Sequence, residues 1–321
     1  MRISLIIFLL SFFLLFSCKK DESELIPNPI LKLDETISVD GILRTFHIQH
    51  PQDSKNKPLV VLLHGHGGSS DQSIGEGLGK NPQKIWLKIA QEQEFIVVVP
   101  NGELGPEESR GWNDCRTDAI GNPSTDDVKF ITNLLEKIEQ EYSHDKGRVY
   151  ITGISNGALM TQRLAEEIPE KIAAFASVVN SLPENSICIE SDEVISALYM
   201  NGTVDPLVPY GGGQISSNRG IVKSTDESIL YWIQRNQTDT TPIIEKFDNI
   251  NIDDNSTVEK ATYKNGLNNS EVILYKIIGG GHTEPSKSEK YSQIYKTIVG
   301  EQNEDIEMAE EIWKFFKDKI K

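Results

Sequence analysis

Cysteine and basic residues are scarce in this chain of 321 residues. The three cysteines follow no metal-binding spacing, so the chain is neither a disulfide-rich scaffold nor a thiolate metal protein. Lysine and arginine number 32 against 48 acidic residues, and the net charge is −16. This balance argues against nucleic acid as a partner, because its phosphates would be repelled. No internal repeat is present, and 38% hydrophobic residues suffice for a globular core.

Long apolar runs are also absent, apart from one at the N-terminus. Residues 3–16 are apolar and follow Arg2; the run is short for a bilayer span but suits the core of a signal peptide. We therefore expect residues 1–17 to be a signal peptide. Leu15-Phe16-Ser17-Cys18 resembles a bacterial lipobox, which implies cleavage before Cys18 and lipidation of this cysteine. The alternative is a plain secretory signal with an incidental cysteine.

The segment after Cys18 is polar and contains two prolines, which is typical of a short tether. We expect a lipid-anchored tether over residues 18–33 and one catalytic domain over residues 34–321. Lys19 replaces the aspartate of an inner-membrane retention signal, which favours an outer-membrane or cell-surface, extracytoplasmic lipoprotein. In such an oxidising compartment Cys115 and Cys188 can pair, and two buried thiols are the alternative.

Apolar runs of strand length alternate with helical patterns along most of the chain, which predicts an α/β fold with a mostly parallel sheet and helices on both faces. Asp40-Gly41 separates the first two runs, which predicts an antiparallel N-terminal hairpin. The expected strands are residues 36–39, 44–49, 58–63, 95–99, 148–152, 172–179, 194–200 and 271–278, and the expected helices are residues 82–94, 126–138, 158–167, 225–234 and 304–321.

The residues around Ser155 form a Gly-x-Ser-x-Gly pentapeptide between a β-branched run and a helical pattern. This context predicts a nucleophile elbow, a sharp turn that holds the serine in strained geometry while Gly153 and Gly157 avoid collisions. The N–H of Asn156 would then point toward an oxyanion formed by attack of Ser155. A buried strand that ends in a glycine-rich turn is the alternative.

A second glycine-rich loop, His64-Gly65-His66-Gly67-Gly68, follows another buried strand. It has the form of the loop that supplies the second oxyanion donor in α/β-hydrolases, and the N–H of His66 is the candidate. His64 and His66 do not suggest a metal pair, because alternate residues point to opposite faces and no carboxylate or thiol motif accompanies them. We expect neither a metal nor a cofactor.

A serine nucleophile needs a histidine base and an orienting acid. His282 is the only histidine after Ser155, and three glycines precede it, which suggests an open, flexible loop. Asp205 directly follows a predicted buried strand, and Pro206 stiffens its turn. A core histidine and a solvated loop aspartate are the alternative interpretations of these two residues.

Residues 103–125 are long, polar and aperiodic, which is typical of a functional loop. Trp112 in this loop is a candidate wall of the substrate pocket. An equally good interpretation is that Trp112 only pins the loop to the surface.

Together these motifs resemble those of the polyhydroxybutyrate depolymerase and feruloyl esterase family of secreted α/β-hydrolases. The resemblance covers about residues 40–320 and implies an esterase triad of Ser155, Asp205 and His282, with oxyanion N–H groups from His66 and Asn156. The chain departs from many relatives at His66, where they carry cysteine. The residues that carry the resemblance are 63–68, 111–113, 126–128, 153–158, 201–205, 208–210, 224–227, 231–232 and 279–285.

The predicted function is hydrolysis of carboxylic esters outside the cell, on feruloyl or acetyl esters of plant-wall polysaccharide or on hydroxyalkanoate esters. A serine peptidase of the prolyl oligopeptidase type is the enzymatic alternative, because it shares the triad. A glycan-binding surface lipoprotein without activity is the alternative from another class.

Overall fold

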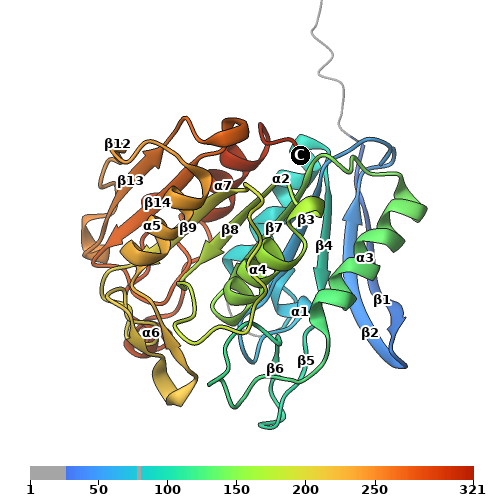
Figure 1. The fold of residues 1–321 in the computed structure, drawn as a ribbon, viewed down its shortest axis with the longest axis horizontal. Coiled ribbons are helices and arrows are strands. Elements are labelled where there is room, and N and C mark those ends of the chain that lie inside the picture. The colour runs from blue at the N-terminus through green and yellow to red at the C-terminus, as the bar shows by residue number, and fades with distance from the viewer. Residues whose placement is uncertain (1–26, 78–80) are drawn as a thin grey trace, which may run out of the picture.

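The computed structural model describes residues 27–77 and 81–321 of the chain (Figure 1). A ten-stranded sheet in the order β1-β2-β4-β3-β7-β8-β9-β14-β13-β12 runs through the molecule. Its strands are β1 (Ile30–Val39), β2 (Ile42–His50), β3 (Leu59–Leu63), β4 (Ile96–Pro100), β7 (Val149–Ile154), β8 (Ala174–Val178), β9 (Ser196–Gly202), β12 (Ile243–Lys246), β13 (Thr257–Tyr263) and β14 (Val272–Ile278).

The strands from β4 to β14 in this order pair in parallel, whereas β1, β2, β13 and β12 pair antiparallel. Two further ribbons of two strands each lie outside the sheet. They are β5 (Glu103–Leu104) with β6 (Arg110–Gly111) and β10 (Gly213–Gln214) with β11 (Ile221–Val222). The helices are α1 (Ser70–Ser73), α2 (Ile85–Gln93), α3 (Asp127–Tyr142), α4 (Asn156–Glu167), α5 (Thr225–Asn236), α6 (Gln293–Val299) and α7 (Met308–Phe316).

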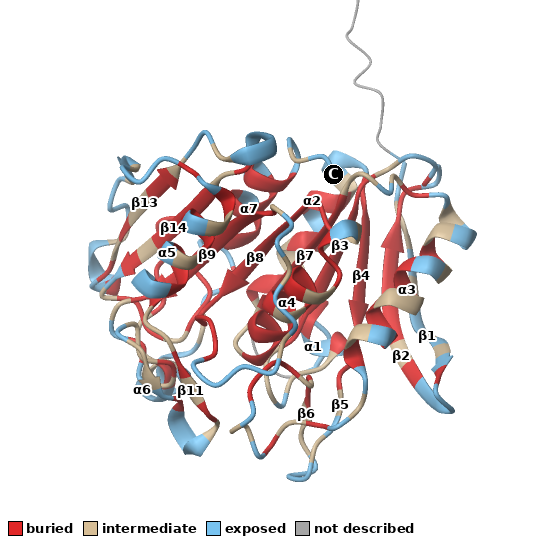
Figure 2. Cartoon of the chain, in the orientation of Figure 1, coloured by how far each residue is buried: buried red, intermediate tan, exposed pale blue. Residues whose placement is uncertain are grey.

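Helices cover both faces of the sheet, and this explains the unbroken apolar runs of its central strands. Every residue of β3 and β4 is buried, because each strand meets a helix layer on either side. Helices α3, α4 and α5 pack on one face and α2 and α7 on the other, which gives two separate cores. Figure 2 shows the buried strands between helices whose outer faces are exposed. The predicted α/β-hydrolase fold class is confirmed.

Helix α3 illustrates how the local sequence sets these elements. The Asp126 side chain accepts a hydrogen bond from the Lys129 N–H and so caps the first turn. The buried residues of the helix then recur at helical spacing on the face toward the sheet, at Phe130, Ile131, Leu134, Leu135 and Ile138.

The short helices α1 and α6 and the two ribbons were not predicted from the sequence, and three further parts of the chain also differ from the prediction. Strand β1 begins at Ile30, inside the predicted tether 18–33, so the folded domain starts earlier than expected. The hairpin β12–β13 was not predicted, because every residue of β12 is exposed and leaves no apolar pattern. The predicted helix 304–321 shrinks to α7, because residues 302–307 form a loop whose polar side chains, including Gln302 and Asn303, are buried and hydrogen-bonded.

The predicted signal peptide and Cys18 lie outside the described residues. Within residues 27–77 and 81–321, no helix has the length and apolarity to span a bilayer. Ile30 pairs with His50, at the end of β2 that adjoins the start of β4. The first strand of the described chain therefore starts beside the N-terminal ends of the parallel strands.

Candidate active site

Ser155 lies at a sharp turn between β7 and α4. Its backbone has φ 53° and ψ −118°, a conformation that L-residues rarely adopt. The turn is held by the Ser155 N–H, which donates to the Val178 carbonyl at 3.0 Å. A side chain on Gly153 would collide with the Gly157 carbonyl, and one on Gly157 would collide with the carbonyls of Leu63 and His64. The structure thus places Ser155 in the elbow geometry that the pentapeptide predicts.

Asp205 and His282 meet at the edge where the parallel strands end. Asp205 follows β9 and His282 follows β14, and these two strands are parallel neighbours. His282 Nδ1 lies 2.7 Å from Asp205 Oδ2. Asp205 Oδ1 accepts hydrogen bonds from the N–H groups of Leu207 and Val208 at 2.7 and 2.8 Å. Because an ionised carboxylate only accepts, the imidazole proton lies on Nδ1 and Nε2 is free to accept another.

The glycines before His282 do not form the open, flexible loop that the sequence suggested. A side chain on Gly281 would collide with the backbone of Val299 and Gly300, and one on Gly280 would collide with Ile277. The Gly281 and His282 N–H groups donate to the carbonyls of Glu301 and Val299 at 2.8 and 2.6 Å. The glycines permit close packing, which fixes the backbone of His282.

Ser155 and His282 line one pocket of about 810 Å³. No hydrogen bond joins the Ser155 hydroxyl to His282 within the described part of the chain. In enzymes without substrate such contacts are often long and tighten only in the complex. The pocket therefore brings together the serine, the free Nε2 and space for a small substrate.

The predicted oxyanion donors lie beside Ser155. A side chain on Gly65 would lie 3.4 Å from the Ser155 Cβ, so the loop that carries His66 packs directly on the elbow. Asn156 is the first residue of α4, where an N–H has no acceptor in the helix. Among the described residues, neither the His66 N–H nor the Asn156 N–H donates to another group. Both are available to an oxyanion in the pocket.

The prediction that Trp112 walls the pocket is wrong. Trp112 is 0% exposed and is not among the residues that line the pocket. Its indole N–H donates to the His64 carbonyl at 2.8 Å, and its backbone N–H donates to Asn156 Oδ1 at 2.7 Å. A large apolar ring with one polar atom is most stable when it is buried with that atom paired. Trp112 fastens the loop 103–125 to the loop after β3 and to the first residue of α4.

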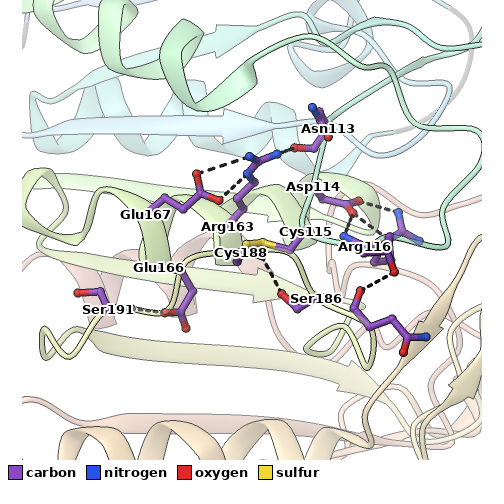
Figure 3. The surroundings of a disulfide bond; sticks show 12 residues. Asn113, Asp114, Cys115, Arg116, Arg163, Glu166, Glu167, Ser186, Cys188 and Ser191 are labelled. Atoms are coloured by element: carbon purple, nitrogen blue, oxygen red, sulfur yellow. Dashed lines mark hydrogen bonds and ion pairs between the residues drawn. A yellow bond between two sulfur atoms is a disulfide. The ribbon is translucent and has the colours of Figure 1, made fainter.

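The structure joins Cys115 to Cys188, one of the two outcomes that the sequence left open (Figure 3). Their Cα atoms are 5.1 Å apart. On either side of Cys115, the buried Asp114 and Arg116 form a salt bridge at 2.6 Å, and Asn156 Nδ2 donates to Asp114 at 2.7 Å. The disulfide therefore ties down the loop that orients the first residue of α4.

Sequence reasoning missed several residues of the pocket. Asn180 follows β8, lines the pocket and donates through Nδ2 to the Ser155 carbonyl at 3.0 Å. Its position just after a strand end was a usable signal. The segment after His282 also lines the pocket, at Glu284, Lys290, Tyr291, Ser292 and Tyr295. No periodicity marks this segment, and only its proximity to His282 could have drawn attention to it.

Two groups in the described ranges bring three potential metal ligands together. One contains Cys115, Cys188 and Glu167, but its sulfurs are joined in the disulfide. The other contains Asp34, His47 and Asp71, but both ring nitrogens of His47 already have partners, in the Asp34 N–H and the Asp71 carboxylate. Neither group includes His64 or His66.

The fold and the strained elbow define an α/β-hydrolase. A model of the prolyl oligopeptidase family matches residues 84–205. The chain is 28% identical over 171 residues to a bifunctional acetylxylan esterase/xylanase of Neocallimastix patriciarum, covering 53% of this chain and 22% of that protein. It is 30% identical over 130 residues to an acetylxylan esterase of Coprinopsis cinerea, covering 40% of this chain and 33% of that protein. The chain thus spans less than half the length of these relatives.

A relative of more similar size is the probable feruloyl esterase C of Aspergillus niger, 26% identical over 174 residues, with 53% of this chain and 58% of that protein covered. Among solved structures, an acetyl xylan esterase from Aspergillus awamori is 17% identical with a TM-score of 0.48, and the match covers 79% of this chain and 93% of that chain. A likeness of this degree carries no argument about function.

His64 is a buried histidine at the wall of the pocket. Its Nδ1 bonds to the Gly65 carbonyl at 2.7 Å, and its Nε2 accepts from the Gly102 N–H at 3.0 Å. Burial lowers the pKa of His64 to about 4. As the pH falls below about 6.5, the unfolded chain binds a proton that the folded protein excludes, so the free energy of unfolding decreases by about 1.4 kcal/mol per pH unit until about pH 4.

We predict that wild type loses about 2 kcal/mol more of its free energy of unfolding between pH 7 and pH 5 than His64→Asn does. The variant has no imidazole at this position, so neither its folded nor its unfolded state binds a proton there. It is less stable than wild type at pH 7, because the two buried hydrogen bonds of His64 are lost. Urea unfolding at both pH values measures the difference. Equal losses in the two proteins would contradict the prediction.

Proposed function

We propose that this protein is a serine carboxylic-ester hydrolase in which Ser155, His282 and Asp205 act together. The observation that carries the proposal is the 2.7 Å contact between Asp205 and His282, and His282 lines the same pocket as the elbow serine. The names of the curated relatives, acetylxylan esterase and feruloyl esterase, support the same chemistry.

The geometry supports a two-step mechanism. The Ser155 hydroxyl attacks the ester carbonyl while His282 Nε2 takes its proton, and Asp205 stabilises the resulting imidazolium. The oxyanion accepts hydrogen bonds from the N–H groups of His66 and Asn156. His282 then gives its proton to the leaving alcohol, and an acyl-serine ester remains. Water, deprotonated by His282, attacks this ester and releases the acid and the free serine.

The proposed substrates are feruloyl or acetyl esters of plant-wall polysaccharide, or hydroxyalkanoate esters. A pocket of about 810 Å³ is large enough for an acyl group and part of its alcohol. The printed names of the relatives favour the polysaccharide esters.

A serine peptidase is the second candidate, because the prolyl oligopeptidase family model matches residues 84–205. A panel of nitrophenyl acyl esters, methyl ferulate and a peptide amide separates the two. Turnover of the esters with none of the amide supports the esterase. The reverse result assigns a peptidase, and no turnover of either class would support a glycan-binding lipoprotein.

We further propose that the protein is an extracytoplasmic lipoprotein anchored through Cys18. The pocket is lined by residues that follow the ends of the parallel strands β7, β8 and β14. Strand β1 starts at the opposite end of these strands, where they begin (Figure 1). An anchor that precedes β1 would be attached on the side of the domain opposite to the pocket, which leaves the pocket open to a polymer.

The first prediction from the proposed function concerns the nucleophile. Ser155→Ala should reduce turnover of a nitrophenyl ester by up to about 10⁶ without unfolding the protein, because no other group supplies the attacking oxygen. Ser38→Ala, an exposed substitution on β1, is the matched control and should keep wild-type activity. A folded Ser155→Ala protein with more than a few per cent of wild-type turnover would exclude Ser155 as the nucleophile.

The second prediction concerns the orienting acid. Asp205→Asn should lower turnover by about 10⁴ with a much smaller change in KM, because the amide favours the wrong imidazole tautomer. Asp226→Asn, at an exposed aspartate in the first turn of α5, should stay near wild type. Steady-state kinetics of both variants checks this. If Asp205→Asn turns over within tenfold of wild type, another residue orients His282.

The third prediction concerns the anchor. Cys18→Ser should move the protein from the membrane fraction to the soluble fraction, because the acylated thiol is lost. Ser23→Ala, a change in the same tether, should leave it in the membrane fraction. Fractionation of lysed cells with immunoblotting measures both, and wild type found in the soluble fraction would refute the anchor.

A further inference from the structure

The direction of proton transfer divides the pocket into two sides. In the proposed mechanism His282 must reach the leaving oxygen, so the alcohol part of the substrate lies beside the imidazole. The acyl part extends from the carbonyl carbon, whose oxygen accepts from the His66 and Asn156 N–H groups. Five residues of the segment after His282 line the same pocket and are placed to contact the alcohol part: Glu284, Lys290, Tyr291, Ser292 and Tyr295.

Glu284 is the most unusual residue on the alcohol side. It is only 4% exposed, yet it lines the pocket. Its Oε2 accepts from the Tyr291 hydroxyl at 2.7 Å, whereas its buried Oε1 has no hydrogen-bond partner among the described residues. A buried carboxyl oxygen without a partner is costly, which suggests that a bound molecule supplies one.

The backbone around Glu284 is held in place before any ligand arrives. Gln302 is completely buried, and its Nε2 donates to the Glu284 carbonyl at 2.9 Å. Its Oε1 accepts from the Tyr291 N–H at 2.7 Å. The side-chain amide of Gln302 therefore holds the backbone of both Glu284 and Tyr291 in place. A preorganised binding group requires such support.

Two aromatic rings lie beside this pair. The rings of Tyr291 and Tyr295 are 4.8 Å apart, and Tyr295, on α6, is 43% exposed. Both line the pocket. Such rings offer apolar faces against which the C–H groups of a saturated ring can pack.

We propose that Glu284 is a specificity-determining residue that hydrogen-bonds through Oε1 to a hydroxyl group on the alcohol part of the substrate, while Tyr291 and Tyr295 pack against the same part. The substrates that fit are esters of polyhydroxylated rings with a free hydroxyl next to the ester. This inference rests on the proposed ester hydrolysis. Either protonation state of Glu284 serves, because the neutral acid donates to a hydroxyl and the carboxylate accepts from it.

The test compares two acetate esters that differ in one hydroxyl group, trans-2-hydroxycyclohexyl acetate and cyclohexyl acetate. The ratio of their kcat/KM values, corrected for their rates of alkaline hydrolysis, measures recognition of the hydroxyl. Wild type should prefer the hydroxy ester by about tenfold. Glu284→Leu should abolish the preference, and Glu284→Gln, which keeps a donor and an acceptor, should retain most of it.

Two further variants complete the experiment. Tyr295→Ala should lower kcat/KM for both ring esters by several fold relative to ethyl acetate, because the packing face is lost. Glu310→Gln, at an exposed residue of α7, is the control and should keep the wild-type ratio. If Glu284→Leu does not fold, Glu284→Met replaces it, since its unbranched side chain also lacks hydrogen-bonding groups.

The outcomes separate this inference from the proposed function. If wild type hydrolyses both esters without preference, or if a folded Glu284→Leu or Glu284→Met variant keeps the preference, the role of Glu284 is refuted and the esterase proposal stands. If wild type hydrolyses no ester, the proposed function itself fails.

Discussion

The site depends on one steric constraint, the close approach of the first turn of α4 to the end of β3. Gly157 packs on the carbonyls of Leu63 and His64 so closely that no side chain fits between them. This contact brings the start of α4 beside the His64–Gly68 loop, and so it brings both candidate oxyanion N–H groups to one place. The strained backbone of Ser155 follows, because the chain must turn from β7 into a helix already held against the neighbouring strand.

Hydrogen bonds of the Asn156 side chain connect the first turn of α4 to the loop 103–125. The Asn156 amide binds the Trp112 backbone and Asp114, and the indole of Trp112 binds the His64 carbonyl. The disulfide of Cys115 holds the same loop from its other side. A long polar loop thus becomes a rigid support, and its pocket-facing groups do not have to be ordered when a substrate binds.

The sequence predicted those features that depend on neighbours along the chain. The central strands, the elbow at Ser155 and the strand-end positions of Asp205 and His282 follow from local patterns and from the parallel sheet that these patterns imply. The sequence left two interpretations of Trp112 open, a pocket wall and a pin for its loop, because the partner of its indole is 48 residues away. The exposed strand β12 and the buried polar loop around Gln302 were missed for a similar reason, since tertiary contacts override local hydrophobicity there.

The placement of the base and the shape of the alcohol side of the pocket are mechanically linked. The backbone N–H of His282 bonds to Val299, the last residue of α6, and Gln302, just beyond α6, fixes Glu284 and Tyr291. One short segment therefore positions both the proposed base, His282, and the residues that we propose face the leaving alcohol. A change in α6 that admits a different alcohol will also shift His282, so changes of specificity on this side of the pocket should alter kcat together with KM. The candidate oxyanion N–H groups lie outside this segment, because the packing of Gly157 brings them together.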